Sequence, residues 1–236
     1  MKSFISPVWM RFSRSSDPEF LLKGCNIEMN VYDFDGTIYH PDCAVSFAFW
    51  CLWRHPSLAF TYVPKLVKSA IQLKQKKIPR FLFERTFFSF LCMIDDFDEQ
   101  IEKFWDKHIS RVSAWYLAQK RPDDLIISAS PNCIIEPAAR RLGVNFIATE
   151  YDRDVGAFVD NLMFAREKAA YIFDQGFPDI ENFYSDSLAD TPLALCAEKA
   201  HLVTHNAQQV EDWPKLDIDT VKKIHEKIDT GWSVHL

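Results

Sequence analysis

The sequence lacks several features that would assign it to a well-known class of protein. Its six cysteines form no C-x-x-C pair and no cysteine–histidine spacing of the kind that zinc sites use. This argues against a zinc site. Most of the cysteines lie within apolar runs, which predicts reduced, buried thiols and a cytoplasmic location. The chain also has no internal repeat and no low-complexity tract.

An excess of basic residues is missing from the chain as a whole. The net charge of the 236 residues is −6, which argues against nucleic acid as the main partner. This average hides a local contrast, because the segment from Arg54 to Thr86 contains eight Lys or Arg residues and one Glu, an excess of +7. Such a segment suits contact with an anionic surface.

The sequence contains no convincing signal peptide and no convincing membrane span. Pro7 and Arg11 interrupt the first apolar patch. Residues 43–63 come closer to a span, but a basic residue and a proline break them after eleven residues. Residues 1–28 show no clear hydrophobic period, and we expect them to form a mobile N-terminal extension.

Strands and helices are predicted to alternate from residue 123 onward. Ser130-Pro131 reads as a helix start with the serine as cap, and Gly143 as the end of that helix. With an opening strand from Met29, the alternation predicts an α/β fold, a Rossmann-like doubly wound parallel sheet with helices on both faces. The expected strands are "DLIISASP", "VNFIATE", "IENFYSD" and "AHLVTH", with a β excursion at "AFVDNLMF", and the expected helices are "AREKAAYIFDQG", "DTPLALCAE" and residues 218–229.

An all-helical block interrupts this alternation directly after the first strand. We expect it to cover the carboxyl edge of the sheet, where open α/β sheets bind ligands. The division is therefore a core of residues 29–42 and 121–236 and a helical cap of residues 43–120. The expected cap helices are 43–55, 57–76, 80–93 and 97–120.

Charged and hydroxyl side chains follow the predicted strands. Two like charges about 4 Å apart repel by roughly 4 kcal/mol at an effective dielectric constant of about 20. Several aspartates can therefore share a pocket only if some are protonated or a divalent cation lies among them. Oxygen ligands without paired His or Cys favour Mg²⁺, and Mg²⁺ with a lysine, a hydroxyl and helix-end N–H groups suits a phosphoryl group. The candidate residues are Asp33, Asp35, Ser128, Lys168, Asp186 and Asp190.

The segments "DFDGT", "IISAS", "REK" and "YSDSLAD" resemble, in this order, the four motifs of the haloacid dehalogenase superfamily of phosphohydrolases. The resemblance covers residues 29 to about 205. It implies that Asp33 is the nucleophile and forms an aspartyl-phosphate, and that Asp35 protonates the leaving oxygen and then activates water. The presence of an acid at position 35 favours a phosphatase over the dehalogenase branch.

The same resemblance implies the remaining roles at the site. Thr37 is expected to steady Asp35. Mg²⁺ is expected as the cofactor, held by Asp33, the main-chain carbonyl of Asp35 and Asp186, with Asp190 as a ligand or directly behind one. The implied phosphate-binding residues are Ser128, Ala129, Lys168, Gly36 and Thr37.

A closer resemblance concerns the cap. "DFDGTIYHPDCAVSF", "RHPSLAF", "SASP" and "YSDSLADTPLA" look like the phosphoserine-phosphatase-like subfamily IB with a helical C1 cap, and the cap is most similar to that of the C-type phosphatidylglycerophosphatases. This implies a phosphate monoester with an apolar portion, such as the lipid phosphate phosphatidylglycerophosphate. Two departures are Tyr39-His40-Pro41, where serine phosphatases have an acid, and Ser185, where many relatives have glycine. His40 is a further candidate for contact with the substrate.

Other interpretations remain open at this point. They are a soluble small-metabolite phosphatase of the phosphoserine phosphatase type, phosphotransfer to another acceptor, and a membrane-associated binding module without catalysis. The segment "CAVSFAFWCLW" is hydrophobic all round if helical, and a small cap hides such a helix with difficulty. Together with the basic segment that follows, it predicts peripheral contact with an anionic membrane at its inner face. The alternative is that it packs between cap and core while the lysines are merely solvated.

Overall fold

The computed structural model describes residues 29–177 and 179–229, so the predicted extension at residues 1–28 lies outside the described residues. Its main sheet has six strands in the order β3-β2-β1-β6-β7-β8. The strands from β3 to β7 in this order are parallel, and β8 is antiparallel to β7. The strands are β1 (Met29–Tyr32), β2 (Leu125–Pro131), β3 (Asn145–Thr149), β6 (Ile180–Ser185), β7 (Ala197–Thr204) and β8 (Gln209–Asp212).

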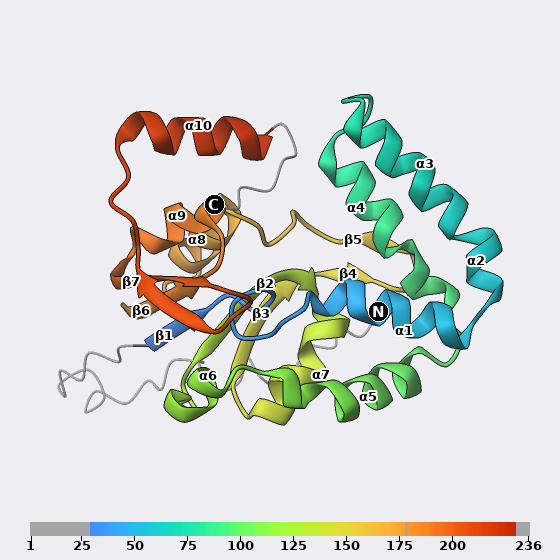
Figure 1. Ribbon diagram of the computed structural model, residues 1–236, viewed down its shortest axis with the longest axis horizontal. Helices are drawn as coiled ribbons and strands as arrows, with labels where there is room; N and C mark the ends of the chain where they lie inside the picture. The colour runs from blue at the N-terminus through green and yellow to red at the C-terminus, as the bar shows by residue number, and fades with distance from the viewer. Residues whose placement is uncertain (1–28, 178, 230–236) are drawn as a thin grey trace.

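Helices cover both faces of this sheet (Figure 1). Val31 of β1 packs on one face in a core that includes Ile172 of α8. The next residue, Tyr32, packs on the other face in a core that includes Ile134 of α7. This arrangement confirms the predicted doubly wound α/β fold and explains why β1 is buried along its whole length. The helices are α7 (Asn132–Leu142), α8 (Arg166–Asp174), α9 (Thr191–Ala194) and α10 (Ile218–Asp229), with the 3-10 turn η4 (Leu188–Asp190).

The chain between β1 and β2 is helical, as expected, but two predicted helices are interrupted. The expected helix over 57–76 breaks because Pro64 takes the first turn of a new helix, where its missing N–H costs no hydrogen bond. The expected helix over 97–120 breaks because the main-chain N–H of Ser113 donates to the carbonyl of Ile38 at 2.8 Å. The elements are α1 (Cys43–Arg54), α2 (Ser57–Thr61), α3 (Val63–Lys74), α4 (Arg80–Phe88), η2 (Ser89–Met93), α5 (Phe97–His108), η3 (Ile109–Arg111) and α6 (Ala114–Gln119).

Two small β elements differ from the sequence prediction. Of the β excursion predicted at residues 157–164, only the short strand β5 (Ala157–Phe158) forms. It pairs antiparallel with β4 (Tyr151–Asp152), which lies before the predicted range. β8 was not predicted, because its sequence "QVED" is fully exposed at the sheet edge and has no apolar face that a pattern would reveal.

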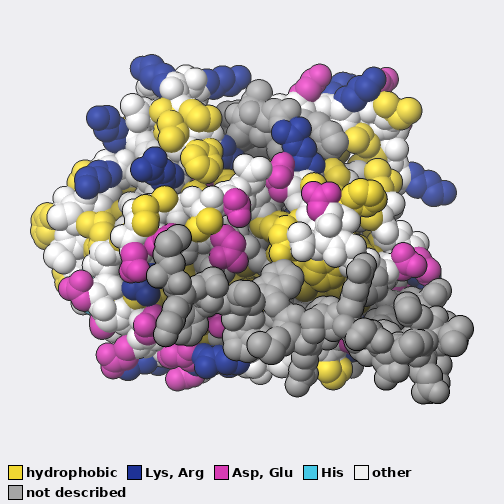
Figure 2. Space-filling model, turned by 180° about the vertical axis from the view of Figure 1, so that it is seen from behind, with side chains coloured by type: hydrophobic (Ala, Val, Ile, Leu, Met, Phe, Trp, Pro, Cys, Tyr) yellow, Lys and Arg dark blue, Asp and Glu magenta, His cyan; other side chains and the backbone are white. Residues whose placement is uncertain are grey.

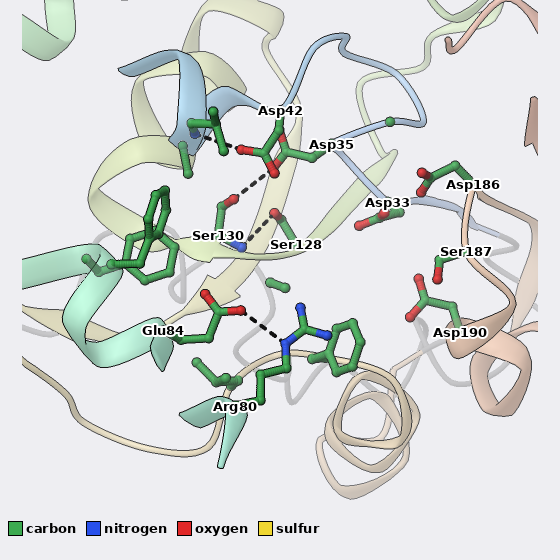
Figure 3. A pocket seen from close by; sticks show the side chains of 18 of the residues that line it. Asp33, Asp35, Asp42, Arg80, Glu84, Ser128, Ser130, Asp186, Ser187 and Asp190 are labelled. Carbon is green, nitrogen blue, oxygen red and sulfur yellow. Dashed lines mark hydrogen bonds and ion pairs between the residues drawn. The ribbon is translucent and has the colours of Figure 1, made fainter. Parts of the chain in front are cut away.

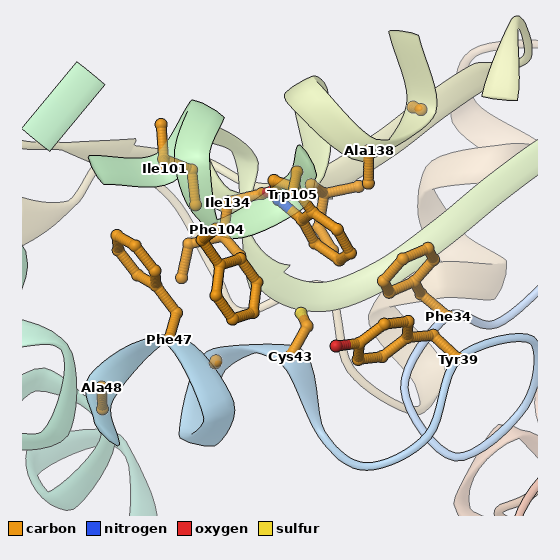
Figure 4. Packing of buried hydrophobic residues seen from close by; sticks show 14 of the residues in the cluster. Phe34, Tyr39, Cys43, Phe47, Ala48, Ile101, Phe104, Trp105, Ile134 and Ala138 are labelled. Atoms are coloured by element: carbon orange, nitrogen blue, oxygen red, sulfur yellow. The ribbon is translucent and has the colours of Figure 1, made fainter. Parts of the chain in front are cut away.

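Aromatic side chains join the inserted helices to the sheet in one continuous core (Figure 4). The ring centroids of Phe47 and Phe104 lie 5.2 Å apart, and those of Phe34 and Trp105 lie 5.8 Å apart. The indole N–H of Trp105 donates to the carbonyl of Ile134 at 2.8 Å. α1 thus contacts β2 and α5 packs against α7, while α2, α3 and α4 extend outward (Figure 1). The predicted boundary between core and cap stays a prediction.

Two further expectations concern the environment of the chain. No helix within residues 29–177 and 179–229 is long and apolar enough to cross a bilayer. The five described cysteines are free; Cys43 and Cys51 are buried as expected, whereas Cys92 and Cys196 are exposed.

Candidate active site

The predicted site residues meet at the carboxyl ends of β1, β2 and β6. A cavity of about 510 Å³ opens there (Figure 3). Thr37 is the single predicted residue that does not line it. Those that do are Asp33, Asp35, Gly36, His40, Ser128, Ala129, Lys168, Asp186 and Asp190. As predicted, the site joins side chains that are up to about 157 positions apart in the sequence, because parallel strands end at one edge of a sheet.

Lys168 is the centre of the charge network. Its side chain is 2 % exposed, and its Nζ donates to Asp33 Oδ1 and to Asp190 Oδ2, both at 2.8 Å. Burial alone would lower the pKa of Lys168, but the carboxylates of Asp190 and Asp33 outweigh it and raise that pKa, so the lysine is charged at neutral pH. The two carboxylates also offset the unfavourable position of a cation in the first turn of α8.

Asp186 faces this network from the β6 side (Figure 3). Burial, followed by the negative charges of Asp33 and Asp190, raises its pKa to about 7. Burial also raises the pKa of Asp33, while Lys168 opposes that rise. With three carboxylates and one ammonium, the ionised cluster carries an excess negative charge that favours a cation.

Gly36 and Thr37 shape the position of Asp186. Gly36 has a φ of +78°, and a Cβ built on it would lie 2.2 Å from Asp186 Oδ2. Thr37 is fully buried; its hydroxyl accepts from the Asp186 main-chain N–H at 2.9 Å and donates to Asp186 Oδ1 at 3.4 Å. The hydroxyl of Thr37 thus bonds to Asp186, directly after the neighbouring strand β6, and not to Asp35 as expected. That Thr37 binds phosphate stays a prediction.

Asp35 is held by a different group of donors. Its Oδ1 accepts from the Cys43 N–H at 2.6 Å, and its Oδ2 accepts from the hydroxyl of Ser130 at 2.7 Å and from the Cys43 thiol at 3.3 Å. Burial and then the charge of Asp42 raise the pKa of Asp35 well above its ordinary value. A carboxyl with such a pKa holds a proton at higher pH than usual, which a general acid requires.

Ser130 does not cap a helix, contrary to the sequence prediction. α7 begins at Asn132, and its N-cap position is Pro131 without a side-chain cap bond. The hydroxyl of Ser130 is bonded to Asp35 instead, and its N–H donates to the hydroxyl of Ser128 at 3.1 Å. Ser128 itself is 1 % exposed and borders the cavity.

Ser185 is a further residue that the sequence did not identify as functional. Its hydroxyl donates to Asp190 Oδ2 at 2.8 Å and accepts from the Ser187 N–H at 3.1 Å. Asp190 Oδ2 thus has two donors, and although Asp190 occupies the N-cap of α9, its side chain makes no cap bond. The only signal in the sequence was the serine at position 185 itself, where many relatives have glycine.

The inserted helices supply one wall of the cavity. Arg80 and Glu84 of α4 form an ion pair of 3.0 Å, and the guanidinium of Arg80 extends toward the middle of the pocket (Figure 3). Arg80 Nη1 is buried and has no hydrogen-bond partner among the residues that the structure describes. The sequence predicted that inserted helices cover this edge of the sheet, but it did not indicate which of their side chains line the cavity. Its apolar lining residues are Phe83, Phe87 and Phe88 of α4 and Leu162 and Phe164 of the segment before α8.

The donor set fits a magnesium ion in chemistry and number. Within the described parts of the chain, no three His, Cys, Asp or Glu side chains are grouped as a ready metal cage. Asp190 accepts from both Lys168 and Ser185, whereas Asp33 accepts from Lys168 through Oδ1 alone. The charge of Asp33 also acts more strongly on Asp186 than that of Asp190, so Asp33 and Asp186 are the carboxylates best placed to share a cation. Mg²⁺ is commonly held by one or two carboxylates while its remaining ligands are water and substrate oxygens.

Comparison with known proteins agrees with this geometry. The family model of the haloacid dehalogenase-like hydrolases matches residues 31–195. No curated protein matches the chain by sequence.

Three solved structures have a similar fold. A protein of unknown function from Bordetella pertussis Tohama I has a TM-score of 0.62 at 18% identity, covering 73% of this chain and 88% of its own. A phosphoserine phosphohydrolase-like protein from Francisella tularensis subsp. tularensis SCHU S4 has a TM-score of 0.50 at 16% identity, covering 75% and 88%. A cytosolic 5'-nucleotidase IIIB bound to cytidine has a TM-score of 0.51 at 14% identity, covering 88% and 89%.

Proposed function

Because the chain belongs to the haloacid dehalogenase-like hydrolases, we propose that it hydrolyses phosphate monoesters through an aspartyl-phosphate on Asp33. The observation that carries the proposal is the bridge of Lys168 between Asp33 and Asp190, in the same cavity as an acid with a strongly raised pKa. A buried cation beside a nucleophilic carboxylate suits the binding of an anionic phosphoryl group.

In the first step, a carboxylate oxygen of Asp33 attacks phosphorus and the bond between phosphorus and the ester oxygen breaks. The leaving oxygen takes the proton of Asp35, whose raised pKa supports this role. In the second step, Asp35, now ionised, accepts a proton from water as the water oxygen attacks phosphorus. The bond between phosphorus and Asp33 breaks, which releases inorganic phosphate and restores both carboxyl groups.

The chain's own residues hold the phosphoryl oxygens. Lys168 and the hydroxyl of Ser128 border the cavity where that group would lie, and the main chain of Ala129 follows at the end of β2. Asp33, the carbonyl of Asp35 and Asp186 would bind Mg²⁺. When bound, Mg²⁺ supplies positive charge that neutralises the phosphoryl oxygens.

We further propose that the substrate is a phosphate monoester with an apolar portion, such as phosphatidylglycerophosphate. The phenylalanines of α4 and the 162–164 segment support an apolar leaving group. The free Arg80 Nη1 supports a hydrogen-bond acceptor or an anion on that leaving group. The alternative is a soluble substrate of the phosphoserine type. The carboxylate of Glu84 is less available to bind such a substrate, because it is paired with Arg80.

The test is phosphate release from a panel of lipid and soluble phosphomonoesters, with and without EDTA. We expect turnover that needs Mg²⁺ and that Asp33→Asn lowers by at least about a thousandfold. Asp174→Asn, an exposed acid on α8, is the matched control and should leave turnover unchanged. Release that survives both EDTA and Asp33→Asn would exclude the proposed chemistry, and phosphoserine turnover equal to that of every lipid phosphate would exclude the lipid substrate.

A further inference from the structure

Among the residues that the structure describes, the inserted helices carry several large apolar side chains that are mostly exposed to solvent. Phe49 and Trp53 of α1 are 67 % and 86 % exposed, and Phe60 of α2 is 83 % exposed. Val67 and Ile71 of the next helix, α3, are each 51 % exposed and lie one helical turn apart. We call these five residues the outer apolar surface. Exposing so many large side chains in one region is costly in water, and such patches commonly mark an interaction site.

The segment that includes α2, α3 and α4 is rich in positive charge. The whole chain carries −6 and the segment from Arg54 to Thr86 carries +7, so the remainder carries −13. Seen from behind, the α2–α4 end of the molecule carries Lys and Arg side chains next to hydrophobic ones, with Asp and Glu side chains below (Figure 2). The exposed cations of the segment include Arg54, Lys65, Lys68, Lys74, Lys76 and Lys77.

A shallow cationic hollow adjoins the aromatic residues. It has a volume of about 380 Å³, and its lining includes the aromatic side chains of Phe49 and Trp53 and the guanidinium groups of Arg54 and Arg111. Aromatic side chains that border guanidinium groups suit the interfacial region of a bilayer, where rings enter the headgroup layer and cations meet lipid phosphates.

From these observations we infer that the outer apolar surface docks on the surface of an anionic lipid bilayer. A second copy of the chain fits less well, because two faces with an excess of +7 would repel each other. The remainder of the molecule carries a net charge of −13, which negative lipids repel. This repulsion turns the basic face toward the membrane. α4 packs against α3 and lines the catalytic cavity with its other side, so a docked molecule would hold that cavity close to the membrane.

This inference names a partner and requires no catalysis, so it is tested by binding alone. Flotation with vesicles of phosphatidylcholine containing about 30 % phosphatidylglycerol should recover the protein, while pure phosphatidylcholine should recover little. Raising the salt to about 0.5 M should lower the bound fraction about tenfold, because the Debye length becomes shorter than the distance to the headgroups. Equal recovery with both vesicle types, or recovery with neither, overturns the inference.

Substitutions separate this surface from exposed residues elsewhere. The triple variant Phe49→Ser, Trp53→Ser, Phe60→Ser should reduce vesicle binding at least tenfold, and Lys65→Glu with Lys68→Glu should do the same. The matched controls are Phe173→Ser, at a site 85 % exposed on α8, and Lys222→Glu with Lys223→Glu on α10. Controls that lose as much binding overturn the inference.

Three further measurements complete the test. Turnover of p-nitrophenyl phosphate and the melting temperature by circular dichroism should be unchanged in the triple variant, which shows that the fold is intact. If the wild type has no phosphatase activity while vesicle binding behaves as expected, the proposed function fails and the docking surface stands. A concentration-dependent dimer in sedimentation velocity that the triple variant abolishes would assign this surface to a second copy and overturn the inference.

Discussion

At the scale of single residues, the cavity is dominated by one lysine among three carboxylates. Lys168 neutralises part of the charge of Asp33 and Asp190, while Asp186 has no cation of its own among the interactions described. Buried charges without full compensation destabilise a fold. The cluster is therefore expected to weaken the metal-free protein and to gain stability when a cation binds.

Asp186→Asn tests this electrostatic cost through its pH dependence. Burial raises the pKa of Asp186 from its usual 3.8 to about 7 in the folded protein, so the folded state binds more protons between these values and stability falls as the pH rises through that window. In EDTA, the stabilisation by Asp186→Asn should therefore be larger at pH 8 than at pH 5, by about 2–3 kcal/mol. Urea denaturation at the two pH values measures this; a stabilisation that is equal at both would contradict the assigned charge.

Ser130→Ala tests whether the hydroxyl of this serine positions Asp35. Losing the donor at 2.7 Å removes a bond that favours the ionised form, so the pKa of Asp35 should rise further. We expect kcat to fall about tenfold for alkyl phosphates, whose leaving group needs a proton, and to change little for p-nitrophenyl phosphate. Ser130→Thr keeps the hydroxyl and should restore most of the rate. An equal loss with both substrate types would indicate a merely structural role.

Gly36→Ala and Gly143→Ala form a matched pair. Both glycines have a positive φ, +78° and +68°, so each alanine should cost about 1 kcal/mol of backbone strain. A Cβ at Gly143 meets nothing within 4 Å, whereas one at Gly36 would displace the Asp186 carboxylate. Thermal unfolding should therefore show a loss in both variants, while Mg²⁺-dependent phosphate release should be lost in Gly36→Ala alone. Full activity in Gly36→Ala would show that the position of Asp186 is not needed.

At the scale of elements, α4 has two roles. It belongs to the outward-extending helices, and it also presents Arg80, Glu84 and three phenylalanines to the catalytic cavity. α4 lies far from the strands of the sheet in sequence. It nevertheless forms a wall of the cavity, because the chain turns back toward the sheet after α3 (Figure 1).

Arg80→Gln tests the part of α4 that faces the cavity. The guanidinium is held by Glu84 and lies over the ring of Phe164 at 4.3 Å, which leaves Nη1 for the substrate. For a monoester whose leaving group carries an anion, KM should rise about tenfold with kcat nearly unchanged. For p-nitrophenyl phosphate both parameters should stay close to those of the wild type. A loss of kcat with both substrates would show that Arg80 supports the site as a whole and not the leaving group.

At the scale of the whole molecule, the inserted helices and the sheet share one aromatic core. Phe47, Phe104 and Trp105 of the insertion belong to the same buried cluster as Tyr32 and Ile134 of the sheet side. Such sharing predicts that the two parts unfold together, as compact units with one core do.

Phe104→Ala tests this cooperativity. The side chain is fully buried, so its truncation should cost about 3–5 kcal/mol. Thermal unfolding followed by far-UV circular dichroism and by tryptophan fluorescence should give one coincident transition in the wild type and one lowered transition in the variant. Phe173→Ala, at an exposed position of α8, should leave the transition in place. Two separate transitions would mean that the insertion folds as an independent unit.

The sequence by itself was sufficient for the fold class and for bringing most of the candidate polar residues to one cavity. Hydrophobic runs and glycine stops report local structure, and Gly143 does end α7 in the left-handed conformation. The order of the polar strand ends was enough to bring Asp33, Lys168 and Asp190 into one cavity, because the topology of a parallel sheet leaves few alternatives.

Only the tertiary structure decided which of these groups bond to one another. Ser130 donates to Asp35 across 95 residues, and Thr37 contacts Asp186 across 149. The local pattern had suggested a helix cap for Ser130, and the family resemblance had implied Asp35 as the partner of Thr37. The wall formed by Arg80 and the exposure of Trp53 were likewise decided by packing. The physical reason is that periodicity encodes which face of an element is apolar, while hydrogen-bond partners and solvent exposure depend on how distant elements meet.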